Sequence, residues 1–268
     1  MGDDNLIAVR GLRKRFGELN AVDGISFDVK QGNVFAFLGP NGAGKSTTIK
    51  MLITLLPPTS GTATIDGMDV QHDASLVRRR IGYVPQLISV DGTLTAFENL
   101  MLMARLYDIP ARDCANRARE VLAFLELEDH ADALVRTFSG GMIRKLEIGQ
   151  AIVHRPKALF LDEPTSGLDP VARQNVWEHI LELRKTNGTT IFFSTHQMEE
   201  ADAMSDAIAI MNAGKIAIIG TPAEIKAKTG DAKATLEEAF IFITGTNLQE
   251  GGTFREVRRS RRTERRLG

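Results

Sequence analysis

The segment GPNGAGKSTTIK, residues 39–50, directly follows the apolar run VFAFL at residues 34–38. Gly39, Gly44, Lys45 and Ser46 fit the pattern G-x-x-x-x-G-K-[ST], which is typical of a phosphate-binding loop. Glycine lets backbone N–H groups converge on phosphate oxygens, and the helix that follows directs its positive end to the same point. A short, fully apolar run is typical of a strand buried on both faces. The segment therefore predicts an α/β fold in which a buried strand leads into a nucleotide-binding loop.

Three side chains of this loop have chemistry suited to a nucleotide. Lys45 supplies a positive charge near the β- and γ-phosphates, Ser46 can bind Mg²⁺ through its hydroxyl, and Thr47 can assist at the phosphates. An ordinary glycine turn that caps a helix is the alternative, and the strand before and helix after the loop count against it. The predicted phosphate-binding set is Gly39, Pro40, Asn41, Gly42, Ala43, Gly44, Lys45, Ser46 and Thr47.

A second group of polar residues lies in ALFLDEPTSGLDP, residues 158–170. Asp162 and Glu163 follow four apolar residues, at the carboxyl end of a predicted strand, where α/β sheets bind ligands. We expect Asp162 to hold Mg²⁺ directly or through water, and Glu163 to polarise a water for attack on the γ-phosphate. Asp169 precedes Pro170 and is predicted to cap a helix. His196 ends another apolar run; it is either structural or a hydrogen-bond donor to the γ-phosphate.

Composition limits the class of protein. The chain has 268 residues, a formal net charge of −1 and one cysteine, Cys114. This length suits one large or two small domains, the charge counts against a generally basic nucleic-acid binder, and no internal disulfide can form. The acidic start MGDDNLIAVR is unlike a signal peptide, and no apolar run is long enough to span a membrane.

The pattern of apolar residues predicts the order of elements. Alternating segments near the N-terminus predict antiparallel strands, and a helix is expected from Lys45 to about Leu55, before Pro57 and Pro58. Residues 95 to about 135 have helical periodicity, and KALFLDE, TTIFFST, AIAIMN and KIAIIG are strands, with helices between the first three. This alternation predicts a largely parallel sheet with a helical insertion and a small antiparallel layer.

The last segment, residues 246–268, holds seven arginines and two glutamates between Phe254 and the end. We expect a disordered, solvated tail; contact with anionic lipids or nucleic acid is the sharper alternative.

One motif has no use in a single phosphate site. FSGGMIRKLEIGQAIVHRP, residues 138–156, begins with a Ser-Gly-Gly turn that opens a helix, which is a second potential anion site. The order of all these motifs resembles the ATP-binding cassette (ABC) ATPase family over about residues 5–245. The resemblance implies a P-loop NTPase core with an antiparallel β-subdomain and an inserted helical subdomain at about residues 87–155.

The resemblance also implies roles for individual residues. Gln86 matches the Q-loop glutamine, which senses Mg²⁺ and contacts a membrane partner, and Phe16 lies where the family has an aromatic that stacks on adenine. The remaining matches are Ser139, Gly140 and Gly141 with the signature motif, Asp162 and Glu163 with the second Walker motif and catalytic glutamate, residues 166–169 with the D-loop including Asp169, and His196 with the switch histidine.

For the whole molecule the resemblance implies ATP and Mg²⁺ as cofactors and a head-to-tail homodimer or heterodimer. Each ATP is then held between one subunit's phosphate loop and the other's signature serine. It also implies a separate integral-membrane permease, a peripheral location at the cytoplasmic face of the cell membrane, and no specific nucleic acid. Met142 and TLEEAF at residues 235–240 are similar to drug- and antibiotic-resistance exporter ATPases of the daunorubicin-resistance type. LEIGQAI departs from the usual Leu-Ser-Leu-Ala-Arg-Ala-Leu.

Two other functions are alternatives to an exporter subunit. A soluble ABC ATPase that remodels nucleic acid or ribosomes usually carries two cassettes or a long coiled coil, and this sequence has neither. A small-molecule P-loop kinase has no use for the signature motif or His196. We therefore expect an ATPase subunit of an exporter whose substrate is a drug, an antibiotic or a lipid-like molecule.

Overall fold

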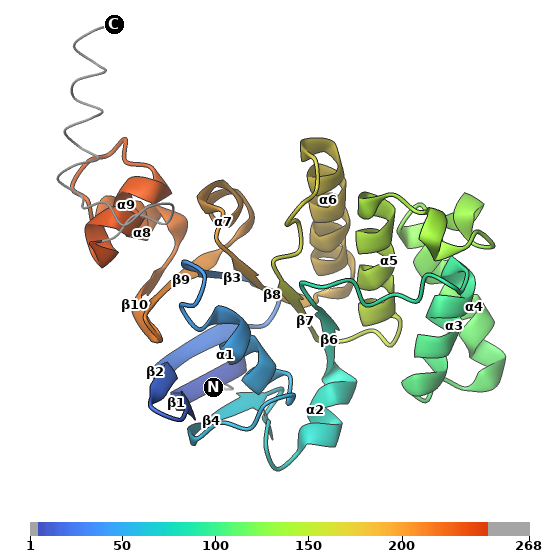
Figure 1. Cartoon of the computed structure of the whole chain (residues 1–268), viewed down its shortest axis with the longest axis horizontal. Helices are drawn as coiled ribbons and strands as arrows, with labels where there is room; N and C mark the ends of the chain where they lie inside the picture. The colour runs from blue at the N-terminus through green and yellow to red at the C-terminus, as the bar shows by residue number, and fades with distance from the viewer. Residues whose placement is uncertain (1–4, 246–268) are drawn as a thin grey trace, which may run out of the picture.

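Two β-sheets form the centre of the molecule, and a group of helices extends from one side (Figure 1). The computed structural model describes residues 5–245. The predicted basic tail at residues 246–268 lies outside the described residues. Within residues 5–245, every helix is too short or too polar to cross a bilayer.

The larger sheet has the strand order β10-β9-β3-β8-β7-β6. Neighbouring strands are parallel from β9 through to β6, and only β10 pairs in the antiparallel sense, with β9. This arrangement confirms the predicted, largely parallel sheet. The strands are β3 (Val34–Leu38), β6 (Ile81–Val84), β7 (Ala158–Asp162), β8 (Thr190–Thr195), β9 (Ala207–Asn212) and β10 (Lys215–Gly220).

The smaller sheet is antiparallel, with the order β2-β1-β4-β5. It confirms the antiparallel layer expected from the alternating N-terminal segments. Its strands are β1 (Asn5–Phe16), β2 (Leu19–Lys30), β4 (Ser60–Ile65) and β5 (Met68–Asp69).

The strand that precedes the phosphate loop is buried on both faces, as its composition predicts. Phe35 and Phe37 of β3 face the smaller sheet, where they pack with Phe27 of β2 and Phe192 of β8 at ring-centroid distances of 5.2–5.6 Å. Alternate residues of β3 pack into the other core, beneath the helices. Because both faces are packed, the end of β3 is a rigid base for the loop that follows.

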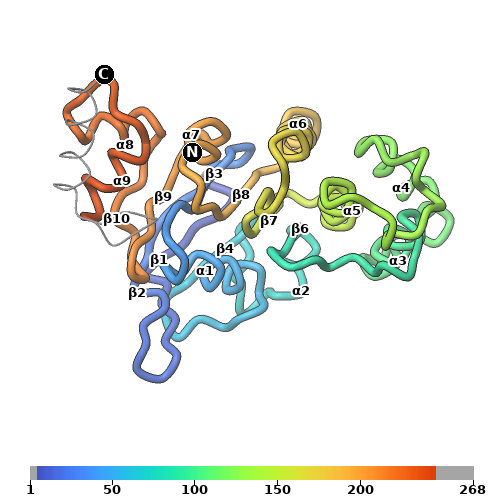
Figure 2. The backbone as a smooth tube through the Cα atoms, turned by 45° about the horizontal axis from the view of Figure 1, so that its top comes forward, coloured from blue at the N-terminus to red at the C-terminus, as the bar shows by residue number. Residues whose placement is uncertain are grey.

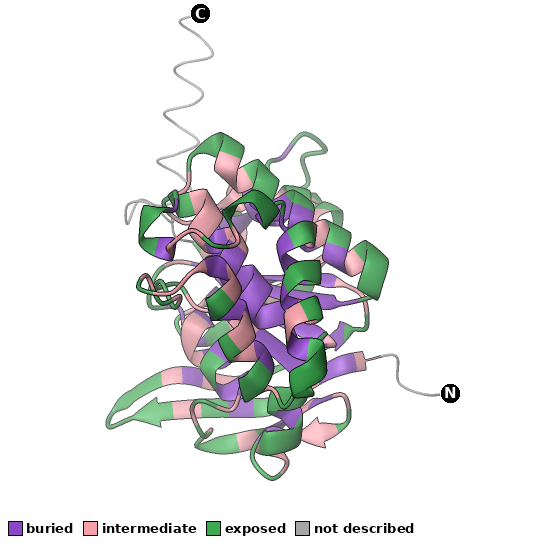
Figure 3. Ribbon diagram, turned by 90° about the vertical axis from the view of Figure 1, so that its right-hand side faces the viewer, coloured by how far each residue is buried: buried purple, intermediate pink, exposed green. Residues whose placement is uncertain are grey.

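The helices α3, α4 and α5 lie together on the side of the molecule beyond β6, in both views of the backbone (Figures 1 and 2). Buried residues line the interior between the helices and the sheet (Figure 3). The helices are α1 (Lys45–Leu52), α2 (Ala74–Arg80), α3 (Ala96–Leu106), α4 (Ala111–Phe124), α5 (Gly140–Ile152), α6 (Pro170–Asn187), α7 (Met198–Met204), α8 (Pro222–Ala227) and α9 (Leu236–Thr244).

The predicted extent of the first helix was wrong by one turn. We expected it to reach about Leu55, but α1 ends at Leu52. Thr54 has a left-handed backbone with φ 67°, and the N–H groups of Leu55 and Leu56 both donate to the carbonyl of Lys50. The chain therefore closes its own helix end before it reaches the two prolines.

Helices α8 and α9 follow a local signal that we did not use. Thr221 and Thr235 each form a complete capping box with the glutamate three residues later, as Thr95 does at the start of α3. A Thr-x-x-Glu pattern satisfies two backbone N–H groups at a helix start, so it could have located both helices.

Candidate functional site

The phosphate loop is held by close backbone contacts that admit only glycine at two positions. A Cβ on Gly39 would lie 2.2 Å from the carbonyl oxygen of Met211, and a Cβ on Gly44 would lie 2.4 Å from that of Ala21. Gly44 also has φ 105°, in the left-handed region. The turn between β9 and β10 adds a further tie, because the N–H of Gly214 donates to the carbonyl of Ala43 at 3.0 Å.

Lys45 is buried inside this loop. Its Nζ donates to the carbonyl oxygens of Gly39 at 2.7 Å and Pro40 at 3.1 Å. Burial lowers the pKa of Lys45, and the nearby carboxylates of Glu163 and Asp162 oppose that shift. The ammonium therefore lies in the cradle where the sequence predicts phosphate, with loop carbonyls as its present acceptors.

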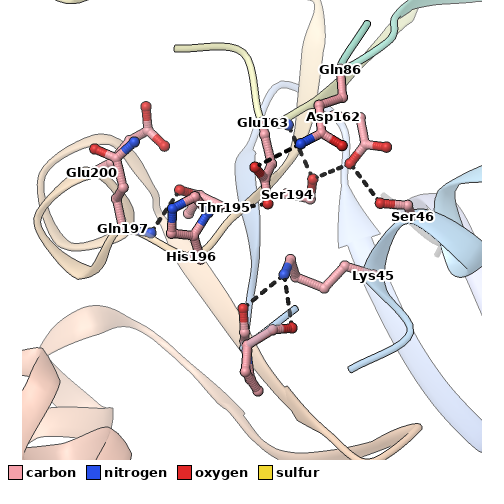
Figure 4. A network of polar contacts seen from close by, with 12 residues as sticks. Lys45, Ser46, Gln86, Asp162, Glu163, Ser194, Thr195, His196, Gln197 and Glu200 are labelled. Carbon is pink, nitrogen blue, oxygen red and sulfur yellow. Dashed lines mark hydrogen bonds and ion pairs between the residues drawn. The ribbon is translucent and has the colours of Figure 1, made fainter. Parts of the chain in front are cut away.

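Asp162 receives two hydroxyl hydrogen bonds at the end of β7. Ser46 Oγ donates to Asp162 Oδ1 at 3.0 Å, and Ser194 Oγ donates to the same oxygen at 2.5 Å (Figure 4). Burial raises the pKa of Tyr83 to about 12, and the nearby carboxylate of Asp162 acts in the same direction. The predicted pair of Ser46 and Asp162 is therefore brought together from α1 and β7, which are 116 residues apart in sequence.

Glu163 occupies an unusual backbone conformation beside Asp162. Its φ is 51°, and its N–H donates to the carbonyl and the Oγ of Ser194 at 3.1 and 3.2 Å. Gln86 Nε2 donates to Glu163 Oε2 at 3.2 Å, and His196 Nδ1 lies 3.1 Å from Glu163 Oε1 (Figure 4). An ionised carboxylate only accepts hydrogen bonds, so His196 Nδ1 carries the proton in this contact. Gln86 and His196 thus approach the two oxygens of one carboxylate.

The phosphate loop, Gln86 and Glu163 open onto one cavity of about 650 Å³. Phe16, at the end of β1, lies on its wall with 48% of its surface exposed, and the ammonium of Lys14 lies 5.2 Å from the ring centroid. The cavity is lined by Phe16, Leu19, Asn20, Ala21, Asn41, Gly42, Gly44, Lys45, Ser46, Thr47, Gln86, Glu163, Ala213 and Gly214. A flat ring near the mouth and a cationic loop inside suit a molecule with a base at one end and phosphates at the other.

The residues assigned to the signature motif lie apart from this cavity. Ser139 caps α5 and accepts a hydrogen bond from the N–H of Met142 at 3.3 Å. A Cβ on Gly141 would lie 3.1 Å from that of Ala172 on α6. Neither Ser139, Gly140 nor Gly141 lines the nucleotide cavity of the same chain. Asp169 caps α6, which confirms that prediction: its Oδ1 accepts from the N–H groups of Val171 and Ala172 at 3.0 and 2.9 Å.

Sequence reasoning missed two contributors to the site. Ser194 lies inside β8 and was treated as part of an apolar strand, yet it contacts both Asp162 and Glu163. Ala213 and Gly214 lie between the predicted strands AIAIMN and KIAIIG and drew no prediction of their own, yet they line the cavity. A polar residue two positions before a candidate histidine, within an apolar strand, is the signal that could have found Ser194.

The donor set suits a magnesium ion bound together with phosphate. Among residues 5–245, no three His, Cys, Asp or Glu side chains gather as a metal site. Mg²⁺ is commonly held by one or two protein oxygens together with phosphates and water. Ser46 and Asp162 supply such oxygens, and Gln86 keeps its amide oxygen as its remaining polar atom while Nε2 contacts Glu163.

Comparison with known proteins places this geometry in a family. Residues 22–166 match the model of the ABC transporter domain. The daunorubicin/doxorubicin resistance ATP-binding protein DrrA of Streptomyces peucetius is 45% identical over 84% of this chain and 68% of its own length. The linearmycin resistance ATP-binding protein LnrL of Bacillus subtilis (strain 168) is 40% identical over 84% of this chain and 72% of its own.

Solved structures agree with the sequence matches. The ATP-binding subunit of an ABC transporter has a TM-score of 0.79 at 31% identity, covering 89% of this chain and 99% of that one. A dimeric ATP-binding cassette in a post-hydrolysis state, bound to ADP and phosphate, has a TM-score of 0.72 at 26% identity, covering 80% of this chain and 98% of that one.

Proposed function

The chain belongs to the ABC transporter family of ATP-binding proteins and is an ATPase, and we propose that its hydrolysis of ATP powers a separate membrane permease that exports a drug, an antibiotic or a lipid-like molecule. The observation that carries the proposal is the carboxylate of Glu163, held by Gln86 and His196 at the mouth of the phosphate loop. The two drug-resistance relatives support the class of substrate.

In this proposal each residue of the site has a separate role. The loop of residues 39–47 binds the phosphates, Phe16 stacks on adenine, and Lys45 leaves the loop carbonyls to contact the β- and γ-phosphates. Glu163 polarises the attacking water, and His196 exchanges its hydrogen bond with Glu163 for one to the γ-phosphate. The contact of His196 with Glu163 before that exchange keeps the two groups on the same side of that phosphate.

Ser46, Asp162 and Gln86 would hold Mg²⁺. When bound, the ion supplies positive charge that neutralises the phosphate oxygens during transfer. Ser194 keeps the carboxylate of Asp162 directed at Ser46, because both hydroxyls donate to Oδ1.

The signature residues would act on the nucleotide of a second subunit. Ser139 caps the start of α5, where the first backbone N–H groups of the helix point out of its N-terminal end. Ser139, Gly140 and Gly141 do not line the nucleotide cavity of their own chain. A head-to-tail dimer explains this arrangement, since it would place Ser139–Gly141 of each subunit against the γ-phosphate held by the other. Asp169, at the neighbouring start of α6, would line the same interface.

The permease would contact a second cavity, which we call the lateral cavity. It has a volume of about 580 Å³ and lies between β6 and the helices α3 and α5, with Pro85, Ser89, Leu106 and Glu147 among its lining residues. Leu87 and Ile88, between Pro85 and Ser89, expose 81% and 67% of their surface. Exposed apolar side chains beside a cavity are typical of protein–protein contact sites, and their link to Gln86 would connect the permease with hydrolysis. Such contact would place the protein peripherally at the cytoplasmic face of the membrane.

The test uses Glu163→Gln as bait. The variant is expected to bind Mg-ATP without turnover, so its complexes persist in detergent-solubilised membranes of the source organism. We expect a polytopic membrane protein to copurify at near-equal stoichiometry. The matched control adds Leu106→Glu, which puts a charge beside the lateral cavity at a side chain that is already exposed, and should abolish copurification while ATP binding remains. Recovery of ribosomes or nucleic acid in place of a membrane protein would overturn the proposed function.

A further inference from the structure

Two charged side chains of α5 are buried together, away from the nucleotide. Arg144 and Glu147 expose only 8% and 1% of their side-chain surface, and Arg144 Nη1 lies 3.0 Å from Glu147 Oε2. Glu147 Oε2 has no hydrogen bond within the described residues, so the ion pair with Arg144 is what offsets the burial of its charge. Burial of an ion pair is costly unless further hydrogen bonds satisfy both partners. The partners in those hydrogen bonds therefore show which segment the ion pair fixes in place.

Both side chains bond to the segment that carries Gln86. Arg144 Nη1 donates to the carbonyl of Pro85 at 2.8 Å, and Nη2 donates to that of Gln86 at 3.4 Å. Glu147 Oε1 accepts from the N–H of Ser89 at 2.6 Å and from its Oγ at 2.9 Å. Arg144 and Glu147 thus hydrogen-bond to both ends of the segment of residues 85–89. We call these two side chains and Ser89 the loop clamp.

The backbone position of Gln86 depends on the loop clamp. Between the clamped ends, Leu87 and Ile88 are the most exposed large apolar residues of the segment and give it little packing of its own. Gln86 in turn donates to Glu163 through Nε2. A shift of 1 Å at Gln86 would break that hydrogen bond, since its length is already 3.2 Å.

We propose that Arg144 and Glu147 are positioning residues for ATP hydrolysis: they fix residues 85–89 to α5, so that Gln86 reaches Glu163. The inference rests on the proposed roles of Gln86 and Glu163. It connects three parts of the molecule through one charge pair. The pair lies on α5, which follows the cap residue Ser139, and both Ser89 and Glu147 line the lateral cavity. A partner that pulls Ser89 from Glu147 would release Gln86 and slow hydrolysis.

Glu147→Gln tests the pair with little change in shape. A glutamine can accept from Ser89 through its oxygen, but its NH₂ then faces the guanidinium of Arg144, donor against donor. We expect kcat to fall about tenfold while the KM for ATP changes by less than about twofold, because the clamp acts on Gln86 and leaves the phosphate loop intact. The matched control is Glu126→Gln. It removes the exposed carboxylate that pairs with Lys145 of α5, and it should leave kcat and KM unchanged.

A double-mutant cycle separates positioning from general damage to the fold. If Glu147 acts through Gln86, Glu147→Gln should lower kcat by less than about twofold in a Gln86→Ala background. A full, multiplicative loss in that background would overturn the proposal. Gln86→Ala alone tests the proposed function: an unchanged kcat would refute the role of Gln86, and with it the kinetic part of the inference.

Hydrogen exchange tests the clamp independently of activity. The Ser89 amide should exchange at least about tenfold faster in Glu147→Ala, which leaves that N–H without its acceptor, while the amides of β7 and β8 keep their protection. Unchanged exchange at Ser89 would contradict the clamp even if kcat fell. If Glu147→Gln fails to fold, Ser89→Ala takes its place, since it removes one of the two bonds to Glu147 and leaves the ion pair.

Discussion

The hydroxyl of Ser194 links the carboxylate of Asp162 to the backbone of Glu163. It donates to Asp162 Oδ1 and accepts from the N–H of Glu163, whose left-handed backbone it thereby supports. A left-handed conformation at a glutamate costs of order 1 kcal/mol and persists where surrounding bonds enforce it. At the scale of the residue, the arrangement of Asp162 and Glu163 therefore depends on a buried serine that does not line the nucleotide cavity.

Replacement of this serine should weaken hydrolysis and metal use together. We expect Ser194→Ala to lower kcat about tenfold and to raise the Mg²⁺ concentration needed for half-maximal rate, because Asp162 loses a donor that orients it. The measurement is the ATPase rate over a Mg²⁺ titration. Ser26→Ala is a matched control, since Ser26 Oγ also accepts a backbone N–H, from Gly11, but lies in the smaller sheet. An unchanged Mg²⁺ requirement in Ser194→Ala would contradict this role.

Glu163 itself can be tested with a change of one heavy atom. Glu163→Gln keeps the size of the side chain and its acceptor for Gln86, but it loses the basic carboxylate. We expect turnover to fall by about 10²–10⁴-fold while ATP binding persists, because the phosphate loop is untouched. Single-turnover hydrolysis and equilibrium nucleotide binding give the two quantities. Turnover at the rate of the unmodified protein would refute the assignment of Glu163 as the base.

At the scale of elements, the end of α5 is fixed to the sheet and to α3 through His154. His154 Nε2 donates to the carbonyl of Ile81 at 2.9 Å, and its ring stacks on Tyr107 of the α3 C-terminus at 3.6 Å between centroids. Nδ1 is buried without a hydrogen bond within the described residues. Burial accordingly lowers the pKa of His154 to about 4, with Arg117 acting in the same direction and the bond to Ile81 opposing.

The buried, neutral side chain of His154 predicts that the protein loses stability in mild acid. The unfolded histidine binds a proton near pH 6.5, whereas the folded one binds it near pH 4, so the free energy of unfolding is undiminished above pH 6.5 and falls as pH drops from 6.5 to 4. The loss is about 2 kcal/mol by pH 5. Urea unfolding at pH 7.5 and pH 5 measures it.

His154→Gln should remove this component of the pH dependence, because its amide can still donate to Ile81 but does not titrate. The control is His72→Gln, at an exposed histidine after β5, which should keep the dependence of the unmodified protein. If His154→Gln loses as much stability in acid as the unmodified protein does, the junction is not the cause.

At the scale of the whole molecule, the two halves of the proposed catalytic machinery do not share a cavity. The nucleotide cavity is bounded by β1, α1 and the β9–β10 turn, whereas the signature residues start α5 beside α6. No rearrangement of a single chain is needed if the second half comes from a partner. The dimeric cassette among the structural neighbours supports that arrangement.

Ser139→Arg should separate ATP binding from dimerisation. We expect this variant to bind ATP as a monomer, since a bulky cation would occupy the space that the partner's nucleotide needs. Light scattering with Mg-ATP, in the Glu163→Gln background, gives the mass. Ser139→Ala loses the same cap to Met142 without added bulk, so it controls for the helix start, and we expect it to dimerise. A stable ATP-dependent dimer of Ser139→Arg would refute the proposed interface.

The sequence alone predicted the candidate phosphate loop, the carboxylates beside it and the order of elements. The phosphate loop, Asp162, Glu163 and the alternation of strands with helices were all predictable, because each depends on a local pattern: glycine at fixed spacing, carboxylates after a buried strand, or apolar periodicity. The cap at Asp169 was predictable for the same reason. The roles assigned to Gln86, Ser139, Phe16 and His196 came from resemblance.

Only the tertiary structure decided which side chains meet. No local pattern names the partner of Ser194 in its contact with Asp162, 32 residues away, or the partner of Glu147 in its contact with Ser89, 58 residues away. The buried charges of Arg144 and Glu147 look like an ordinary solvated helix face when read by spacing. Their partners are set by the packing of α5 against the end of β6, and packing joins residues that no sequence period relates.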